Sequence, residues 1–191
     1  MRILHTSDWH LGRKFGDHPL LGDQRDFLEW LVSLAVDRAV DLVVVSGDLY
    51  DRSMPPGEAV ELFGDTLRSF HRAGIGFVGI AGNHDSPARL AALDGITDAS
   101  GVLLRGGYRR SDDVTVLSIG ESQLAVAAVP FLEPLMSPAA SEGRLTHEEV
   151  LVTALSAARE SLPKKTCSLV LAHAFVAGGQ VSDSERELSV G

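Results

Sequence analysis

The chain has 191 residues, of which 45% are hydrophobic and 23% are charged, and its formal net charge is −9. This length suits one domain with a sizeable core, and the composition is that of an ordinary globular protein. No apolar stretch approaches the length that spans a bilayer, which argues against a membrane-spanning protein. The negative charge argues against a nucleic-acid surface, although bound divalent cations or a basic partner would offset it.

The N-terminus and the cysteine content indicate the compartment. The first residues, MRILHTSDWH, enter a strand-like run at once and lack the charged start, apolar stretch and cleavage site of a signal peptide. Cys167 is the single cysteine, so no internal disulfide can form. We therefore expect a cytoplasmic protein kept in a reducing compartment.

Three apolar runs in the first half predict strands, at residues 2–6, 41–46 and 75–81. In the second run the β-branched residues follow one another without alternation, which is typical of a strand covered on both faces.

The segments between these runs have the apolar spacing of amphipathic helices. The predicted apolar faces are Phe27, Leu31, Leu34 and Ala35 in a helix from Asp23 onward, and Ala59, Phe63, Leu67 and Phe70 in the next. Pro55 and Pro56 precede the second helix and Gly74 follows it, as expected at helix ends. The resulting β-α-β-α-β order favours a parallel sheet with crossover helices.

The second half reads differently. Short strands are predicted at 102–104, 114–119 and 123–129, and a last strand at 167–172 ends at His173. Between them a helix is expected from Thr146 to about Ser161, because Glu149 follows Thr146 by three residues, the spacing of a capping box. We interpret residues 12–22, residues 130–138 and the tail after Val176 as loops.

Polar side chains with metal-binding chemistry follow four of the predicted strands. The sets are Asp8-Trp9-His10, Gly47-Asp48-Leu49-Tyr50-Asp51-Arg52, Gly82-Asn83-His84-Asp85 and Leu171-Ala172-His173. Ligand sites in open α/β sheets lie beyond the carboxyl ends of the strands. Carboxylate, amide oxygen and imidazole are ligands of divalent metals, and the absence of thiolates from these sets argues against a structural zinc site.

Each set also has an ordinary explanation. Asp-x-His occurs by chance, Gly-Asp is a common turn, and Asp85 or Ser86 could cap a helix at 87–93. His173 alone is more often a core histidine than a ligand. The joint order of the sets, each at a predicted strand end, is what predicts a metal site.

In this order the motifs resemble the calcineurin-like metallophosphoesterase superfamily. More narrowly, HTSDWHLGR at 5–13, GDLYDRSMPP at 47–56 and SDSERELSVG at 182–191 are similar to nuclease subunits of double-strand-break repair complexes. The resemblance implies a four-layer α-β-β-α sandwich of two mixed sheets, with two metals at one edge. The alternating pattern of the first half itself favours one sheet, and the short later strands favour the other.

The resemblance also implies roles for the site residues. Asp8 and His10 would hold one metal, Asn83 and His173 the other, and Asp48 would bridge both. The implied metal is manganese, although mixed oxygen and nitrogen ligands also suit iron, zinc or cobalt.

Two further residues would serve catalysis from outside the ligand set. His84 would stabilise the transition state or protonate the leaving oxygen, and Asp51 would accept a hydrogen bond from His84. Arg52 is a candidate phosphate contact or a surface salt bridge. Arg13 lies in a loop that either approaches substrate or is simply solvated, and Trp9 is expected to pack rather than face substrate.

The implied activity is two-metal hydrolysis of phosphodiester bonds in DNA, as an exonuclease on duplex ends and an endonuclease on single strands and hairpins. A partner ATPase subunit, a role in double-strand-break repair and recombination, and a homodimer follow from the same resemblance. The alternatives are another phosphoesterase of the superfamily and a metal-poor, weakly active or inactive binding module.

One departure from the family pattern bears on the last alternative. That pattern ends in Gly-His-x-His, and this sequence contains no His-x-His; His5, His18, His71 and His147 are not placed to substitute. We therefore expect residues 1–191 to be a nuclease domain shortened at its C-terminus, with two ligands missing.

Overall fold

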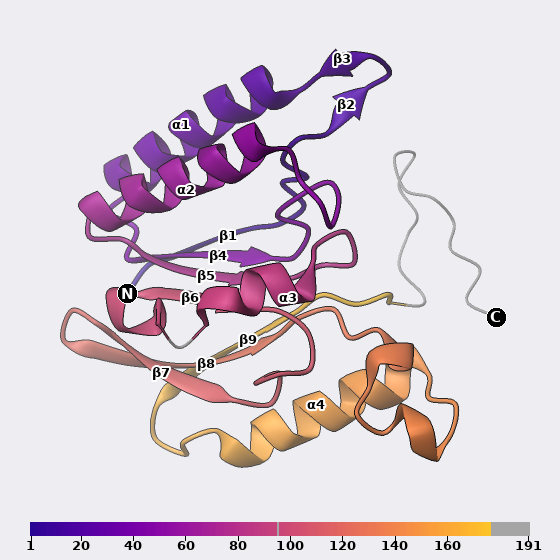
Figure 1. Ribbon diagram of the computed structural model, residues 1–191. Helices are drawn as coiled ribbons and strands as arrows, with labels where there is room; N and C mark the ends of the chain where they lie inside the picture. The colour runs from indigo at the N-terminus through magenta and orange to yellow at the C-terminus, as the bar shows by residue number, and fades with distance from the viewer. Residues whose placement is uncertain (95, 177–191) are drawn as a thin grey trace.

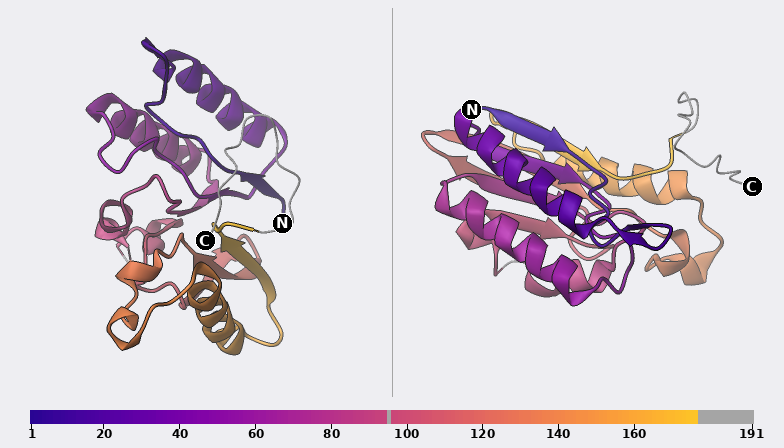
Figure 2. Two further views of the ribbon diagram at one scale, coloured as in Figure 1. Left: turned by 90° about the vertical axis from the view of Figure 1, so that its right-hand side faces the viewer. Right: turned by 90° about the horizontal axis from the view of Figure 1, so that it is seen from above.

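The computed structural model describes residues 1–94 and 96–176, and it arranges them in four layers (Figure 1). Two helices, α1 (Leu21–Asp37) and α2 (Gly57–Arg72), cover one side of a first sheet, and α4 (His147–Ser161) covers the far side of a second. The views in Figure 2 show the same stacking. The predicted α-β-β-α sandwich is confirmed.

The first sheet is entirely parallel within the described residues, in the order β1-β4-β5-β6. Its strands are β1 (Ile3–Thr6), β4 (Leu42–Ser46), β5 (Gly76–Ile80) and β6 (Val102–Arg105). The sequence interpretation was wrong in grouping residues 102–104 with the later strands. Three short helical elements lie between β5 and β6: α3 (Pro87–Leu90), η1 (Ala91–Leu93) and η2 (Asp98–Ser100). They are too short to show a helical periodicity in the sequence.

The second sheet has the order β7-β8-β9. The strands β7 (Val114–Ile119) and β8 (Ser122–Val129) pair antiparallel, and β9 (Cys167–Ala172) pairs parallel to β8 after the crossover through α4. In the described part of the chain, therefore, only this sheet is mixed, and not both as expected. The short turns η3 (Pro134–Met136) and η4 (Ala140–Glu142) lie between β8 and α4.

Apolar side chains fill all three spaces between the layers. The first cluster lies under α1 and α2 and includes Leu28, Phe63 and Phe77; the second joins the two sheets through residues such as Val78 and Val126. A smaller cluster lies under α4. The β-branched run of β4 is buried on both faces, as its composition predicts.

The inward face of α1 differs from the predicted one. Leu28, Leu31 and Ala35 are buried, whereas Phe27 is 41% exposed and packs beside Trp30 with 5.8 Å between ring centroids. Leu28 is three and seven residues before Leu31 and Ala35, so it lies on their face and Phe27 is turned away from it. In contrast, the capping box of α4 is confirmed, since the Glu149 backbone N–H donates to Thr146 Oγ1 at 3.2 Å.

Residues 12–22 are not a simple loop. They contain an antiparallel hairpin of β2 (Lys14–Phe15) and β3 (His18–Pro19), with Gly16 at φ 60° in its turn, and the start of α1. Two-residue strands are too short to show a periodic pattern. No helix in the described residues is both long and apolar enough to cross a membrane. The predicted loop after Val176 and the motif at 182–191 lie outside the described residues.

Candidate metal centre

Four strand ends bring the predicted ligands to one edge of the molecule. The parallel strands β1, β4 and β5 place Asp8, Asp48 and Asn83 at their shared carboxyl edge, and β9 brings His173 there from the second sheet. Backbone hydrogen bonds link the loops: the Asp8 N–H donates to the Gly47 carbonyl at 3.1 Å, and the His10 N–H to the Asp48 carbonyl at 2.9 Å.

The backbone of three candidate ligands has an unusual conformation. Asp8, His10 and Asp48 have φ angles of 56°, 43° and 49°. Left-handed backbone is uncommon for residues other than glycine, costs about 1–3 kcal/mol at each position, and clusters at functional sites. The fold therefore tolerates strain at this edge to hold these side chains where they are.

Asp48 lies at the middle of the centre. Its Oδ2 atom is 3.7 Å from His10 Nε2 and 3.9 Å from His173 Nε2. These two histidines follow strands of different sheets, β1 and β9. On one side His10 Nε2 is 3.9 Å from Asp8 Oδ1, and on the other His173 Nε2 is 3.1 Å from Asn83 Oδ1. One carboxylate oxygen thus faces both predicted ligand pairs.

The two histidines both direct Nε2 toward the centre. His173 Nδ1 lies 2.9 Å from the Ser46 carbonyl oxygen, which can only accept, so Nδ1 donates a proton there and Nε2 is the atom that would bind a cation. His10 Nδ1 lies 3.8 Å from Asp51 Oδ1. Burial has the largest effect on His10 and lowers its pKa. His84 and Arg13 lower the pKa further, whereas Asp48 and Asp8 raise it. The net lowering favours the neutral imidazole, the form that binds a metal.

Two glycines allow the ligands to approach the backbone closely. A Cβ atom on Gly47, which has φ +102°, would lie 2.0 Å from His173 Nδ1. A Cβ atom on Gly82 would lie 2.0 Å from Asp48 Oδ1 and 2.4 Å from the Asp48 backbone nitrogen. Only glycine fits at these two positions while the ligands keep their places.

We expect Gly82→Ala to abolish metal binding and to destabilise the fold by about 1–3 kcal/mol or more, because the Asp48 backbone cannot retreat. Gly64→Ala is the matched control: the added Cβ would meet the flexible end of Arg68 at 3.3 Å, and alanine favours the interior of α2. For both variants the bound manganese per chain and the thermal midpoint of unfolding are measured. Retention of full metal content by Gly82→Ala would contradict the close approach.

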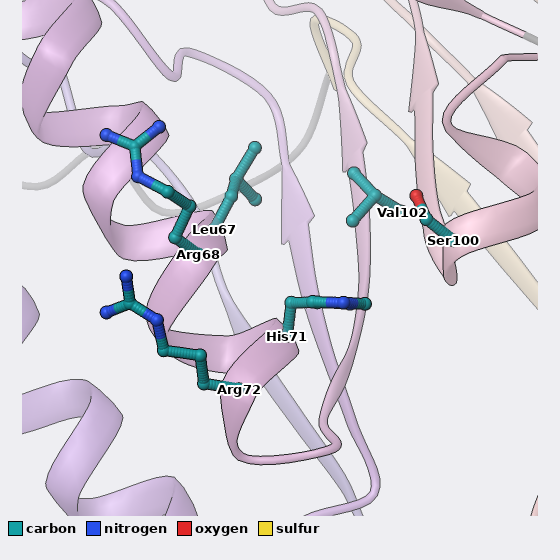
Figure 3. A pocket seen from close by; sticks show the side chains of 6 residues that line it. All are labelled: Leu67, Arg68, His71, Arg72, Ser100 and Val102. Atoms are coloured by element: carbon teal, nitrogen blue, oxygen red, sulfur yellow. The ribbon is translucent and has the colours of Figure 1, made fainter.

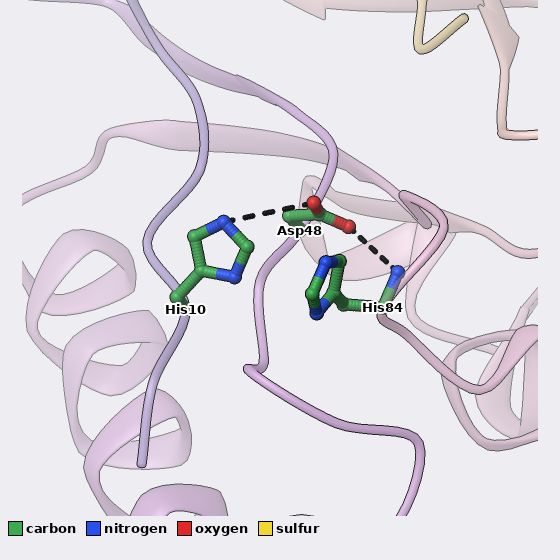
Figure 4. Close-up of side chains that lie close together, drawn as sticks. All are labelled: His10, Asp48 and His84. Carbon is green, nitrogen blue, oxygen red and sulfur yellow. Dashed lines mark hydrogen bonds and ion pairs between the residues drawn. The ribbon is translucent and has the colours of Figure 1, made fainter. Parts of the chain in front are cut away.

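His84 is held by its backbone as well as by its ring. Its N–H donates to Asp48 Oδ1 at 2.9 Å, and its ring stands nearly perpendicular to that of His10, at 86°, with 4.8 Å between centroids (Figure 4). His84 Nδ1 lies 2.9 Å from the backbone carbonyl oxygen of Asp51, not from its carboxylate as we predicted. A carbonyl accepts only, so Nδ1 carries the proton and Nε2 of the exposed ring is left for chemistry.

The Asp51 carboxylate instead faces three cationic or ionisable side chains. Besides His10, Arg13 Nε lies 4.0 Å away and Arg52 Nη2 lies 3.8 Å away. The arginine side chains are 55% and 54% exposed, so they flank the centre while remaining open to solvent.

Sequence reasoning missed the part played by Asp85. Its buried carboxylate accepts the backbone N–H groups of Leu49, Tyr50 and Gly82 at 2.8–3.0 Å and so joins the loop after β4 to the loop after β5. Burial raises the pKa of Asp85 to about 6 against the effect of these donors. Asp85 is not a helix cap, and Ser86, at the cap position of α3, makes no side-chain cap bond.

The donor set fits divalent metal ions. Carboxylate oxygens, an amide oxygen and imidazole nitrogens converge at this edge of the first sheet. Ligand atoms of His10, Asp48 and His84 lie within 4.8 Å of one another, so the geometry also admits His84 as a ligand.

Two other features lie outside this centre. Trp9 is buried and packs against Phe63 and Phe77, so the predicted packing role is confirmed. A shallow pocket includes Arg68, His71 and Val102, where α2 ends and β6 begins, at the opposite edge of the first sheet (Figure 3). Since no predicted site residue lines it, the pocket has no part in the metal chemistry.

Comparison with known proteins agrees with this geometry. The family "Calcineurin-like phosphoesterase" matches residues 1–131. The whole chain is similar to proteins named as the SbcD component of the nuclease SbcCD, at 35% identity in Bacillus subtilis, 31% in Staphylococcus epidermidis and 27% in Escherichia coli K12. It covers 51%, 51% and 50% of those proteins, so it spans about half the length of the curated relatives it matches.

Proposed function

The chain belongs to the calcineurin-like phosphoesterase family, and on this premise we propose that it is the catalytic part of a metal-dependent DNA nuclease. The observation that carries the proposal is the position of Asp48, whose Oδ2 atom lies between His10 at 3.7 Å and His173 at 3.9 Å. A single carboxylate between two imidazoles from different sheets suits a bridging ligand in a two-metal centre.

In this proposal Asp8 and His10 would hold one ion, Asn83 and His173 the other, and Asp48 would contribute to both, with manganese as the metal. When bound, the ions activate water and stabilise charge that develops on the phosphodiester. The remaining groups belong to the chain itself. His84 donates Nδ1–H to the Asp51 carbonyl at 2.9 Å, and in its doubly protonated form it would give the Nε2 proton to the leaving oxygen and return to the neutral ring.

Arg13 and Arg52 are proposed to meet the phosphates on either side of the cleaved bond. Both are more than half exposed, and both lie within 4.0 Å of the Asp51 carboxylate, which holds them near the centre. The whole chain has a net charge of −9, so positive charge from these residues and from bound metals would be needed to attract the phosphates.

The relatives are named as a component of the nuclease SbcCD, and this name supports further parts of the proposal. We propose the SbcC ATPase as partner, exonuclease action on duplex ends, endonuclease action on single strands and hairpins, and a homodimer. A cytoplasmic location, predicted from the single cysteine Cys167, belongs to the same proposal.

Manganese-loaded protein tests the substrate class. We expect cleavage of linear DNA that EDTA abolishes, and a generic aryl phosphate diester should be hydrolysed more slowly, because it lacks the flanking phosphates that Arg13 and Arg52 meet. Gel analysis of end-labelled DNA and release of the aryl group give the two rates. Hydrolysis of the ester without any cleavage of DNA would favour another phosphoesterase of the family instead.

A second candidate function is a binding module with a weak centre. This candidate concerns residues 1–191 as given, which contain no His-x-His motif to add two further ligands to the centre. Elemental analysis decides between the two: two manganese ions per chain support the nuclease, and one or none supports the weak centre.

A further inference from the structure

A group of aromatic rings adjoins the metal centre on the side of the second sheet. The Phe131 ring centroid lies 6.3 Å from that of His173, at 78°, and 5.4 Å from those of His147 and Phe175. His147 and Phe175 are 5.3 Å apart. Phe131, His147 and Phe175 are called the aromatic cluster below. His173 therefore faces Asp48 and Asn83 with Nε2 while its ring meets this cluster.

The cluster is attached to the same backbone that holds the candidate ligands. The Phe131 N–H donates to the Ala81 carbonyl at 2.8 Å, just before Asn83, and Phe175 follows closely after His173. His147 is the first residue of α4. The ends of β8 and β9 and the start of α4 lie toward the same side of the molecule in Figure 1, the side of the β2–β3 hairpin.

Core packing does not account for these rings. Phe63, Phe70 and Phe77 are 6%, 0% and 0% exposed, whereas Phe175 is 38% exposed. The buried cluster under α4 is aliphatic and contains none of the three rings of the aromatic cluster. Partly exposed aromatic rings beside the candidate metal centre are suited to binding a planar ligand.

We propose that the aromatic cluster stacks an unpaired nucleobase of the substrate, next to the phosphodiester bond that is cleaved. This inference rests on the nuclease function proposed above. Every base offers a π face, so stacking on Phe175 binds DNA without regard to sequence. A base inside a duplex is already stacked on its neighbours and cannot reach the rings, so the cluster selects single-stranded, hairpin or frayed DNA.

The charge of the chain makes stacking important. A protein that binds DNA through phosphate contacts alone needs a basic surface and loses affinity steeply as salt rises. With a formal net charge of −9 this chain as a whole repels phosphate, and ring–base contacts supply affinity that salt does not screen. The same rings could instead meet an apolar side chain of a partner protein, an outcome that the following experiment distinguishes.

The test uses single-stranded oligonucleotides with phosphorothioate linkages, so that binding is measured without cleavage, each with 2-aminopurine at a different position. We expect the intact protein to quench fluorescence at one position, and Phe175→Leu to abolish the quenching and weaken binding about tenfold. Phe175→Tyr keeps the aromatic face and should retain both. Phe27→Leu is the matched control, because Phe27 on α1 is 41% exposed, close to the 38% of Phe175.

An abasic residue at the quenched position gives a second test that needs no variant. It should weaken binding by wild-type protein about tenfold and leave binding by Phe175→Leu unchanged. Equal affinity of wild-type protein for base-containing and abasic strands, or no quenching at any position, would overturn the inference and direct attention to a protein partner. Cleavage of linear DNA in manganese tests the nuclease separately: cleavage without quenching rejects the stacking site alone, and quenching without cleavage rejects the nuclease alone.

Discussion

Asp48→Ala is expected to remove metal from both halves of the centre and to lower DNA cleavage at least about a thousandfold, because several kcal/mol of charge stabilisation are lost. Asp8→Ala should remove only part of the metal. The two aspartates differ in position: the Asp48 side chain is 5% exposed and lies within 3.9 Å of both His10 and His173, whereas the Asp8 side chain is 54% exposed and, of these two histidines, approaches His10 among the described contacts.

Metal content per chain and cleavage rate are measured on both variants and on Asp65→Ala. The last is a suitable control, since Asp65 is a 58% exposed carboxylate on α2 that pairs with Arg68. Asp48→Asn adds a test of mechanism, because an amide keeps an acceptor for the His84 N–H but is a poorer ligand. Equal loss of metal from Asp48→Ala and Asp8→Ala would refute the bridging role.

The position of the centre was predictable because it depends on a regular property of parallel sheets. Strands such as 41–46 are recognisable from continuous β-branched residues, and their carboxyl ends must meet at one edge. Once Asp48 and Asn83 were assigned to strand ends, their proximity followed from topology alone. The register of the parallel strands, with Val44 opposite Val78, confirms that expectation.

The details that failed depend on side-chain direction and on backbone atoms. Phe27 and Leu28 are adjacent and both apolar, so a small change in helix phase decides which of them is buried. The partner of His84 is the Asp51 carbonyl, and any residue at position 51 would supply such an oxygen. Asp85 serves two loops through three backbone donors, a role that residue types and spacing cannot indicate.

His84→Gln is expected to keep both metals and to lower DNA cleavage about a hundredfold to ten-thousandfold, as the loss of a general acid does. Glutamine retains the backbone N–H that donates to Asp48 Oδ1 at 2.9 Å, so the metal ligands should stay in place. His71→Gln is the control, since His71 lies in the last turn of α2 at the opposite edge of the first sheet.

The leaving group separates the two roles open to His84. If Nε2 protonates the leaving oxygen, His84→Gln should slow DNA cleavage far more than hydrolysis of an aryl diester, whose phenolate leaves without a proton. If the ring only stabilises charge on the phosphoryl group, both substrates should slow equally. A third result is equally informative. The His10, Asp48 and His84 ligand atoms lie within 4.8 Å of one another, so loss of metal from His84→Gln would make His84 a ligand and would leave the leaving oxygen to take its proton from water.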